Sequence, residues 1–166
     1  MAEGRGDPGG SGPGDPMPEG RGDPGLADPR PVGYELLEHT ADVGIRARGP
    51  TLEAAFEQAT HGLAEVLGAL VPGPGEPVVV EVSAGDLGGV LVDWLNEVLW
   101  LREVRQAKLA VVRVERVGDG TAAGWVAFSG DGPAPDGTSV KAVTYHRLRV
   151  EPDPGGGWLI EVYLDV

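Results

Sequence analysis

The residues best suited to chemistry gather at two places, the stretch 39–42 and the last two positions of the sequence. His39, Thr40 and Asp42 follow a half-apolar strand pattern, where strand ends ordinarily carry turn residues. Asp165 is penultimate, so we expect its carboxylate within a few ångströms of the main-chain carboxylate of Val166. Two such groups repel unless a cation lies between them, and calcium or magnesium takes oxygen ligands from carboxylates. The alternative is that the chain end frays and both groups are simply hydrated.

Composition and charge narrow the chemistry further. The 166-residue sequence contains no cysteine, which excludes a disulfide framework, a thiolate nucleophile and a cysteine-bound zinc ion. Any metal must therefore be bound by oxygen or imidazole. The 13 Lys and Arg against 26 Asp and Glu give a formal net charge of −13, which disfavours binding to phosphate backbones. We therefore expect no strong direct nucleic-acid binding, whereas docking onto a basic enzyme is compatible with this charge.

The first 31 residues differ from the rest of the chain. They contain 9 Gly and 7 Pro, which predicts a disordered tail ahead of a domain over 32–166. The tail holds two copies of EGRGDPG, and duplication of a Gly/Pro-rich tract explains the RGD tripeptides better than an adhesion function does. No apolar run approaches the roughly 18 residues of a membrane span, and there is no apolar signal-peptide core. We expect a cytoplasmic protein without a membrane partner.

Apolar spacing predicts two helices and a series of short strands. Apolar residues recur every three or four positions in 52–67 and 87–103, after the capping residues Thr51 and Asp86. Prolines and glycines predict a loop at 72–77. Strand patterns occur at 34–40, 43–49, 78–82, 110–115, 125–128, 141–150 and 158–166. Because consecutive strands imply antiparallel pairing, the predicted class is α+β, with two helices packed on a largely antiparallel sheet system.

The remaining histidines and two tryptophans have competing interpretations. His61 lies off the apolar stripe of its helix and is predicted at the surface. His146 is two residues from Thr144, on the same face of a strand, and is either a polar neighbour of the functional site or a half-buried polar residue. Trp94 and Trp100 lie about two turns apart on one helix, a spacing that favours the core over a stacking platform.

The sequence resembles the archease family in three stretches, EHTADVGIRARGPTLEAAFEQAT, VKAVTYH and the terminal IEVYLDV. The resemblance runs from Tyr34 to Val166 and implies an archease-like fold. It also implies that a divalent metal is bound by Asp42, Asp165 and the carboxyl end of Val166. Calcium is the metal often placed there in crystals, and manganese or magnesium are candidates in the cell.

The resemblance implies roles for the neighbouring residues as well. His39 and Thr40 would orient the ligands or hydrogen-bond to them. Ala41 and Gly44 are small, which would let the backbone bend and another strand approach. Lys141 is at a position that the family uses for activity, and its positive charge would moderate the repulsion between clustered carboxylates. By itself, Lys141 would be a solvated strand lysine.

The function that the resemblance implies is accessory rather than catalytic. Archeases promote the metal-dependent guanylylation and repeated turnover of the RtcB-type RNA ligase, in transfer RNA splicing and RNA repair. The implied partner is therefore a protein, the ligase. One alternative is a general chaperone or modulator of nucleic-acid-modifying proteins. Another is an autonomous metal-dependent hydrolase using His39, Asp42 and Asp165, which is disfavoured because no nucleophile arrangement and no phosphate-binding glycine loop is evident.

Overall fold

The computed structural model describes residues 31–38, 42–68, 71, 73–130 and 137–166. Along these residues the elements are β1 (Gly33–Glu38), β2 (Asp42–Gly49), α1 (Leu52–Val66), β3 (Glu76–Ser83), α2 (Leu87–Arg105), β4 (Lys108–Gly118), β5 (Thr121–Ser129), β6 (Ala142–Pro152) and β7 (Trp158–Asp165). This is the predicted order of strands and helices. The predicted tail at 1–31, His39 and Thr40 lie outside the described residues, except for Pro31.

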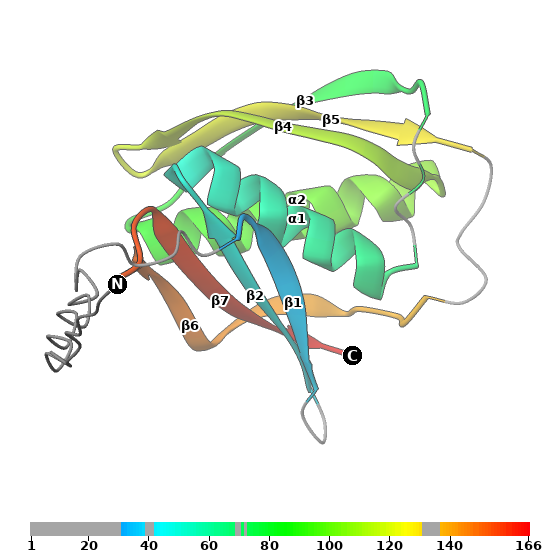
Figure 1. Ribbon diagram of the computed structural model, residues 1–166. Helices are drawn as coiled ribbons and strands as arrows, with labels where there is room; N and C mark the ends of the chain where they lie inside the picture. Colours follow the sequence, from blue (N-terminus) through cyan, green and yellow to red (C-terminus); the bar gives the residue numbers. More distant parts are fainter. Residues whose placement is uncertain (1–30, 39–41, 69–70, 72, 131–136) are drawn as a thin grey trace, which may run out of the picture.

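The strands form two sheets with the two helices between them. Sheet A has the order β1-β2-β7-β6 and sheet B the order β3-β5-β4, and every pairing is antiparallel. Figure 1 shows α1 and α2 as a middle layer, with sheet B on one side and sheet A on the other. The predicted α+β class, with helices packed on antiparallel sheets, is confirmed.

The helices begin where their capping residues predict. The Thr51 hydroxyl accepts a hydrogen bond from the Ala54 amide at 3.1 Å, and the Asp86 carboxylate accepts one from Gly89 at 2.7 Å. Both bonds satisfy amides that have no partner within their own helix. The loop predicted at 72–77 was too long, because Glu76 and Pro77 already belong to β3. Pro77 is tolerated there since β3 is an edge strand of sheet B.

The core lies between the layers and includes one buried polar link. Trp94 is fully buried, and its indole N–H donates to the Thr60 hydroxyl at 3.0 Å, which in turn donates to the Phe56 carbonyl at 2.8 Å. The core prediction for Trp94 is therefore confirmed. That for Trp100 is wrong, because this side chain is 54% exposed near the end of α2. His61 is half-buried rather than a surface residue.

Side chains from α1 cover one edge of sheet B. The Glu57 carboxylate accepts a hydrogen bond from the Val114 amide at 2.9 Å, and Glu53 accepts one from Val117 at 3.2 Å. Both amides belong to β4, an edge strand whose register shifts near this point. The helix thus supplies acceptors for edge amides that no neighbouring strand reaches.

Candidate functional site

The central strands of sheet A place the two predicted acidic ligands side by side. In the antiparallel pair of β2 and β7, Asp42 is directly opposite Asp165. Leu164 and Val162 of β7 are fully buried in the core, so the alternating position of Asp165 is on the outer face of the sheet. Residues directly opposite each other in a sheet have Cβ atoms about 5 Å apart. The two carboxylates therefore share one end of the outer face.

Lys141 joins this pair from the neighbouring edge of the sheet. Its backbone amide donates to the Asp165 carbonyl at 2.8 Å. Its side-chain Nζ donates to the Val166 oxygen at 3.1 Å. Lys141 and Asp165 are exposed, whereas Asp42 and Val166 are half-buried. The lysine thus places a positive charge beside the Val166 oxygen, next to the acidic pair.

Thr144 and His146 lie next to this group, at an irregular part of β6. Thr144 is opposite Tyr163, and its hydroxyl donates to the Tyr163 carbonyl at 3.1 Å. The same hydroxyl accepts a hydrogen bond from the His146 amide at 3.3 Å. The register shifts directly after Thr144, so the simple strand alternation predicted for these two residues does not hold. His146 is exposed rather than half-buried, with its ring edge-on to Tyr163 at a centroid distance of 6.0 Å.

Gly44 leaves space for side chains of the two neighbouring strands. It is opposite Tyr163 on the outer face, and a Cβ at this position would lie 2.9 Å from Tyr163 Cε1 and 3.0 Å from Leu37 Cβ. The space left by the missing side chain is filled by the tyrosine ring and the leucine. Gly44 therefore seats Tyr163, which is only 5% exposed although it lies on the outer face. Ala41 lies outside the described residues.

A network of charged residues continues along the same face. Glu161, whose side chain is 10% exposed, accepts hydrogen bonds from Arg46 Nε at 3.2 Å and Nη2 at 3.1 Å. The Tyr163 hydroxyl donates to the other Glu161 oxygen at 3.1 Å. Arg46 also donates to Glu35 at 3.0 Å, and this hydrogen bond holds the pKa of the Glu35 carboxyl below its usual value. Sequence reasoning missed this network, because its members meet only through the pairing of distant strands.

The donor atoms at the end of sheet A fit a hard divalent cation. Carboxylate and main-chain oxygens are the ligands that calcium, magnesium and manganese prefer. Asp42 and Asp165 would supply two carboxylates, and Val166 would supply a main-chain oxygen. Among the residues that the structure describes, no three Asp, Glu or His side chains form a metal-binding group. A metal at this end would therefore need the Val166 oxygen in addition to the two carboxylates.

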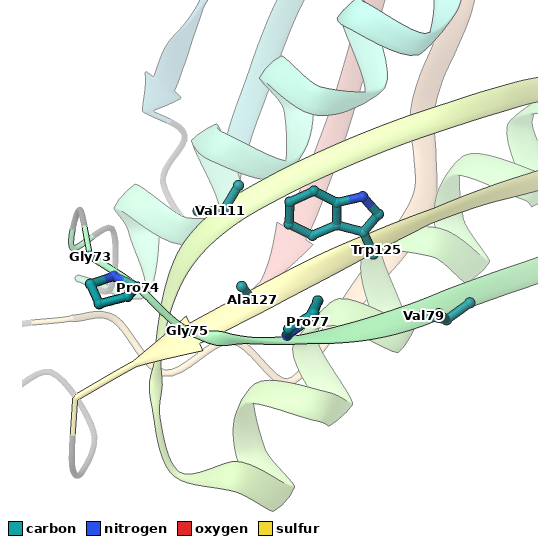
Figure 2. A pocket seen from close by; sticks show the side chains of 8 residues that line it. All are labelled: Gly73, Pro74, Gly75, Pro77, Val79, Val111, Trp125 and Ala127. Carbon is teal, nitrogen blue, oxygen red and sulfur yellow. The ribbon is translucent and has the colours of Figure 1, made fainter.

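An apolar hollow lies on the far side of the helices from the acidic end of sheet A. It is on the outer face of sheet B and has a volume of about 500 Å³. The residues that line it are Gly73, Pro74, Gly75, Pro77, Val79, Val111, Trp125 and Ala127. Figure 2 shows the Trp125 indole lying across β4 and β5, with Pro77 and Val79 on β3 beside it. None of these lining residues titrates. The hollow can therefore contact apolar groups, but it offers no acid, base or metal ligand.

No helix within the described part of the chain is long and apolar enough to cross a membrane.

Comparisons with known proteins agree with the fold and the sequence motifs. Residues 34–166 match the archease protein family (MTH1598/TM1083). Protein archease of Methanosarcina mazei is 36% identical over 141 residues, covering 80% of this chain and 95% of that protein. Protein archease of Thermococcus gammatolerans is 36% identical over 142 residues, covering 80% of this chain and 98% of that protein.

Two solved structures resemble the chain in three dimensions. The solution structure of Methanobacterium thermoautotrophicum protein 1598 has a TM-score of 0.64 and 28% identity, and covers 81% of this chain and 99% of that chain. The crystal structure of a Thermotoga maritima protein described as an archease and possible chaperone has a TM-score of 0.55 and 25% identity, and covers 78% and 94%. With the family match and the relatives above, these likenesses lead to one conclusion. The chain belongs to the archease family.

Proposed function

We propose that this protein is a non-catalytic activator of an RtcB-type RNA ligase, acting in the cytoplasm in transfer RNA splicing or RNA repair. Membership of the archease family supports the proposal. The observation that carries it is the pairing of Asp42 with Asp165 at one end of the outer face of sheet A. The activator would promote the guanylylation of the ligase and its repeated turnover.

The acidic end of sheet A is the part of the surface that would meet the ligase. Asp42, Asp165 and the Val166 oxygen would hold a divalent ion there, and Lys141 would balance the charge of the group. A bound ion would supply positive charge that stabilises phosphate groups of the ligase's nucleotide. The carboxylates of this chain would orient the ion and face the ligase's metal and nucleotide centre. The net charge of −13 favours association with a basic partner surface over direct binding to RNA.

The test measures guanylylation and RNA joining by an RtcB-type ligase with and without this protein. We expect the wild type to raise both, Asp42→Ala to lose the effect while staying folded, and a few residues appended after Val166 to impair it. Asp93→Ala is the matched control, because Asp93 is an exposed acid on α2. If Asp42→Ala stimulates as well as the wild type, the acidic pair is not the functional site.

A general chaperone is the second candidate, and the apolar hollow on sheet B favours it. Val79 at its rim is 74% exposed, and Trp125 offers an aromatic surface to unfolded segments. A chaperone would bind several unrelated client proteins, and its activity would not depend on Asp42. Suppression of client aggregation by both the wild type and Asp42→Ala, with no effect on the ligase, would favour the chaperone.

A further inference from the structure

The outer face of sheet B carries its side chains in three rows. Val80, Val114 and Val126 are buried in the core on the inner face, so the alternate residues of the same strands point away from the helices. The register aligns these outward residues across β3, β5 and β4. The rows are Pro77 with Ala127 and Val111, Val79 with Trp125 and Arg113, and Glu81 with Ala123 and Arg116. Apart from Arg113, the first two rows line the apolar hollow (Figure 2).

The third row holds two opposite charges that do not meet. Glu81 and Arg116 are both exposed, and they lie on either side of Ala123 with the width of β5 between them. Neighbouring strands are about 4.8 Å apart, so the two backbones are about 10 Å apart. Within the described part of the chain, neither side chain has an ion-pair or hydrogen-bond partner. Arg113, in contrast, already contacts Glu57 at 3.7 Å. Glu81 and Arg116 are therefore available to groups outside the chain.

A bulge in β4 decides which charge stands in this row. The register against β5 shifts between Val114 and Arg116, so Glu115 is the extra residue. Without the shift, Glu115 would be opposite Ala123 and would put a second carboxylate in the row of Glu81. Bulges redirect side chains in this way. The row consequently has an acid on one edge strand of the sheet and a base on the other.

We propose that the outer face of sheet B binds the same face of a second copy of this chain. A two-fold axis that runs along β5, between the two faces, places β3 of one copy over β4 of the other. Glu81 then faces Arg116 of the second copy, and Arg116 faces Glu81 of the second copy. In the same way Pro77 lies over Val111, and the two Trp125 side chains meet at the axis. Such reciprocal contacts are what a two-fold interface produces.

Charge complementarity selects this occupant and this orientation. An axis across the strands would put Glu81 and Arg116 over the apolar row of the second copy, where they would lose water without gaining partners. The axis along β5 instead brings opposite charges together and apolar residues together. It also keeps the strands of the two sheets within about 30° of one another, as face-to-face sheets require. The pairing removes Val79, which is 74% exposed, from water.

The size and charge of the two faces predict a dimer that dissociates on dilution. The three strands, of which β3 is 8 residues long, cover roughly 14 Å by 27 Å, or about 400 Å² of sheet per copy. A standard stable interface buries about 800 Å² per partner. The net charge of −13 on each copy opposes association at low ionic strength, but about 0.15 M salt screens exposed charges more than roughly 8 Å apart.

Sedimentation velocity from micromolar to millimolar protein, in about 0.15 M salt, measures the association. We expect the wild type to shift from monomer to dimer. Glu81→Arg and Arg116→Glu should each raise the dissociation constant about tenfold or more, because each replaces two ion pairs by two like-charge contacts. The double variant exchanges the charges and should return to within about threefold of the wild type. Glu38→Arg is the control with the same charge change, because Glu38 is exposed on β1 of sheet A.

Each outcome decides the inference. Weakening by both single reversals, with recovery in the double variant, supports the pairing of Glu81 with Arg116. A wild type that stays monomeric at millimolar concentration overturns it. A dimer that both single reversals leave unchanged also overturns it, because such a dimer uses another surface. Single reversals that weaken the dimer without recovery in the double variant overturn the predicted contact. The association is measured without any ligase, so its failure and that of the proposed function are separate results.

Discussion

Asp42 and Asp165 lie directly opposite each other in the antiparallel pair of β2 and β7, with the Lys141 ammonium at 3.1 Å from the neighbouring Val166 oxygen. Like charges directly opposite each other in a sheet are destabilising. This arrangement therefore costs stability when no cation is bound. It is the kind of local conflict between sequence and fold that is expected at a functional site.

The first prediction concerns this acidic pair. Asp42→Asn should raise the thermal stability slightly in the presence of a chelator, because it removes the like-charge contact. Adding calcium or manganese should then stabilise the wild type by about 2.7 kcal/mol at a hundred times the dissociation constant, and the variant by much less. Thermal unfolding with and without metal measures both effects. Asp93→Asn on α2 is the control, and equal metal responses of the two variants would count against the site.

The second prediction concerns the lysine. Lys141→Met removes the ammonium group that contacts the Val166 oxygen, so the acidic end becomes more negative. We expect calcium to bind several times more tightly to this variant, and the variant without metal to lose stability at low ionic strength. The loss should shrink as salt rises, because exposed charges are screened. Calorimetric titration with calcium measures the affinity, and weaker binding in Lys141→Met would show that the lysine supports the metal rather than competing with it.

The third prediction concerns the packing of the Tyr163 ring against Gly44. Gly44→Ala places a methyl group 2.9 Å from the tyrosine ring and 3.0 Å from Leu37 Cβ, so the ring must move. Overpacking of this kind typically costs about 1–3 kcal/mol. The free energy of unfolding from urea titration measures it. Gly85→Ala should be nearly neutral, because a Cβ at Gly85 has nothing within 4 Å.

The fourth prediction concerns His61 on α1. Burial lowers the pKa of its imidazole, so the folded protein favours the neutral form. As the pH falls below the usual histidine value of about 6.5, the unfolded chain takes up a proton before the folded one does. His61 therefore contributes stability above this pH that is lost on acidification. The stability of the wild type should fall more steeply from pH 7 to about pH 5 than that of His61→Gln, and parallel curves would contradict the prediction.

The elements of this fold were predictable where local signals agree. Helix α1 was expected at 52–67 and occupies Leu52–Val66, because a capping threonine and regular apolar spacing point to the same start and face. The alternation in the last strand also placed Asp165 on the face away from the core. In contrast, the approach of Asp42 to Asp165 was expected only from the resemblance to archeases. Strand register is a long-range property that neither strand specifies alone.

Other features carried no local signal at all. The pattern from Val143 to Arg149 contains no glycine or proline that would mark a bulge, and the extra residues are accommodated by Gly88 and Gly89 on another element. The bonds of Asn96 to β6 depend on how α2 packs against the sheet edge. Trp100 is 54% exposed between the buried Leu99 and Leu101, because it lies on the face of α2 that is turned away from the core. Such outcomes depend on tertiary packing, which spacing within one element does not report.

The most direct measurement of the central claim is the number of RNA molecules joined per molecule of an RtcB-type ligase, with the ligase limiting and this protein in excess. With the wild type, the account predicts many joined molecules per ligase. With Asp42→Asn, folded and still able to bind the ligase, it predicts about one. If Asp42→Asn supports the same turnover as the wild type, or if the wild type leaves the ligase at a single turnover, the claim that the acidic pair activates the ligase is contradicted.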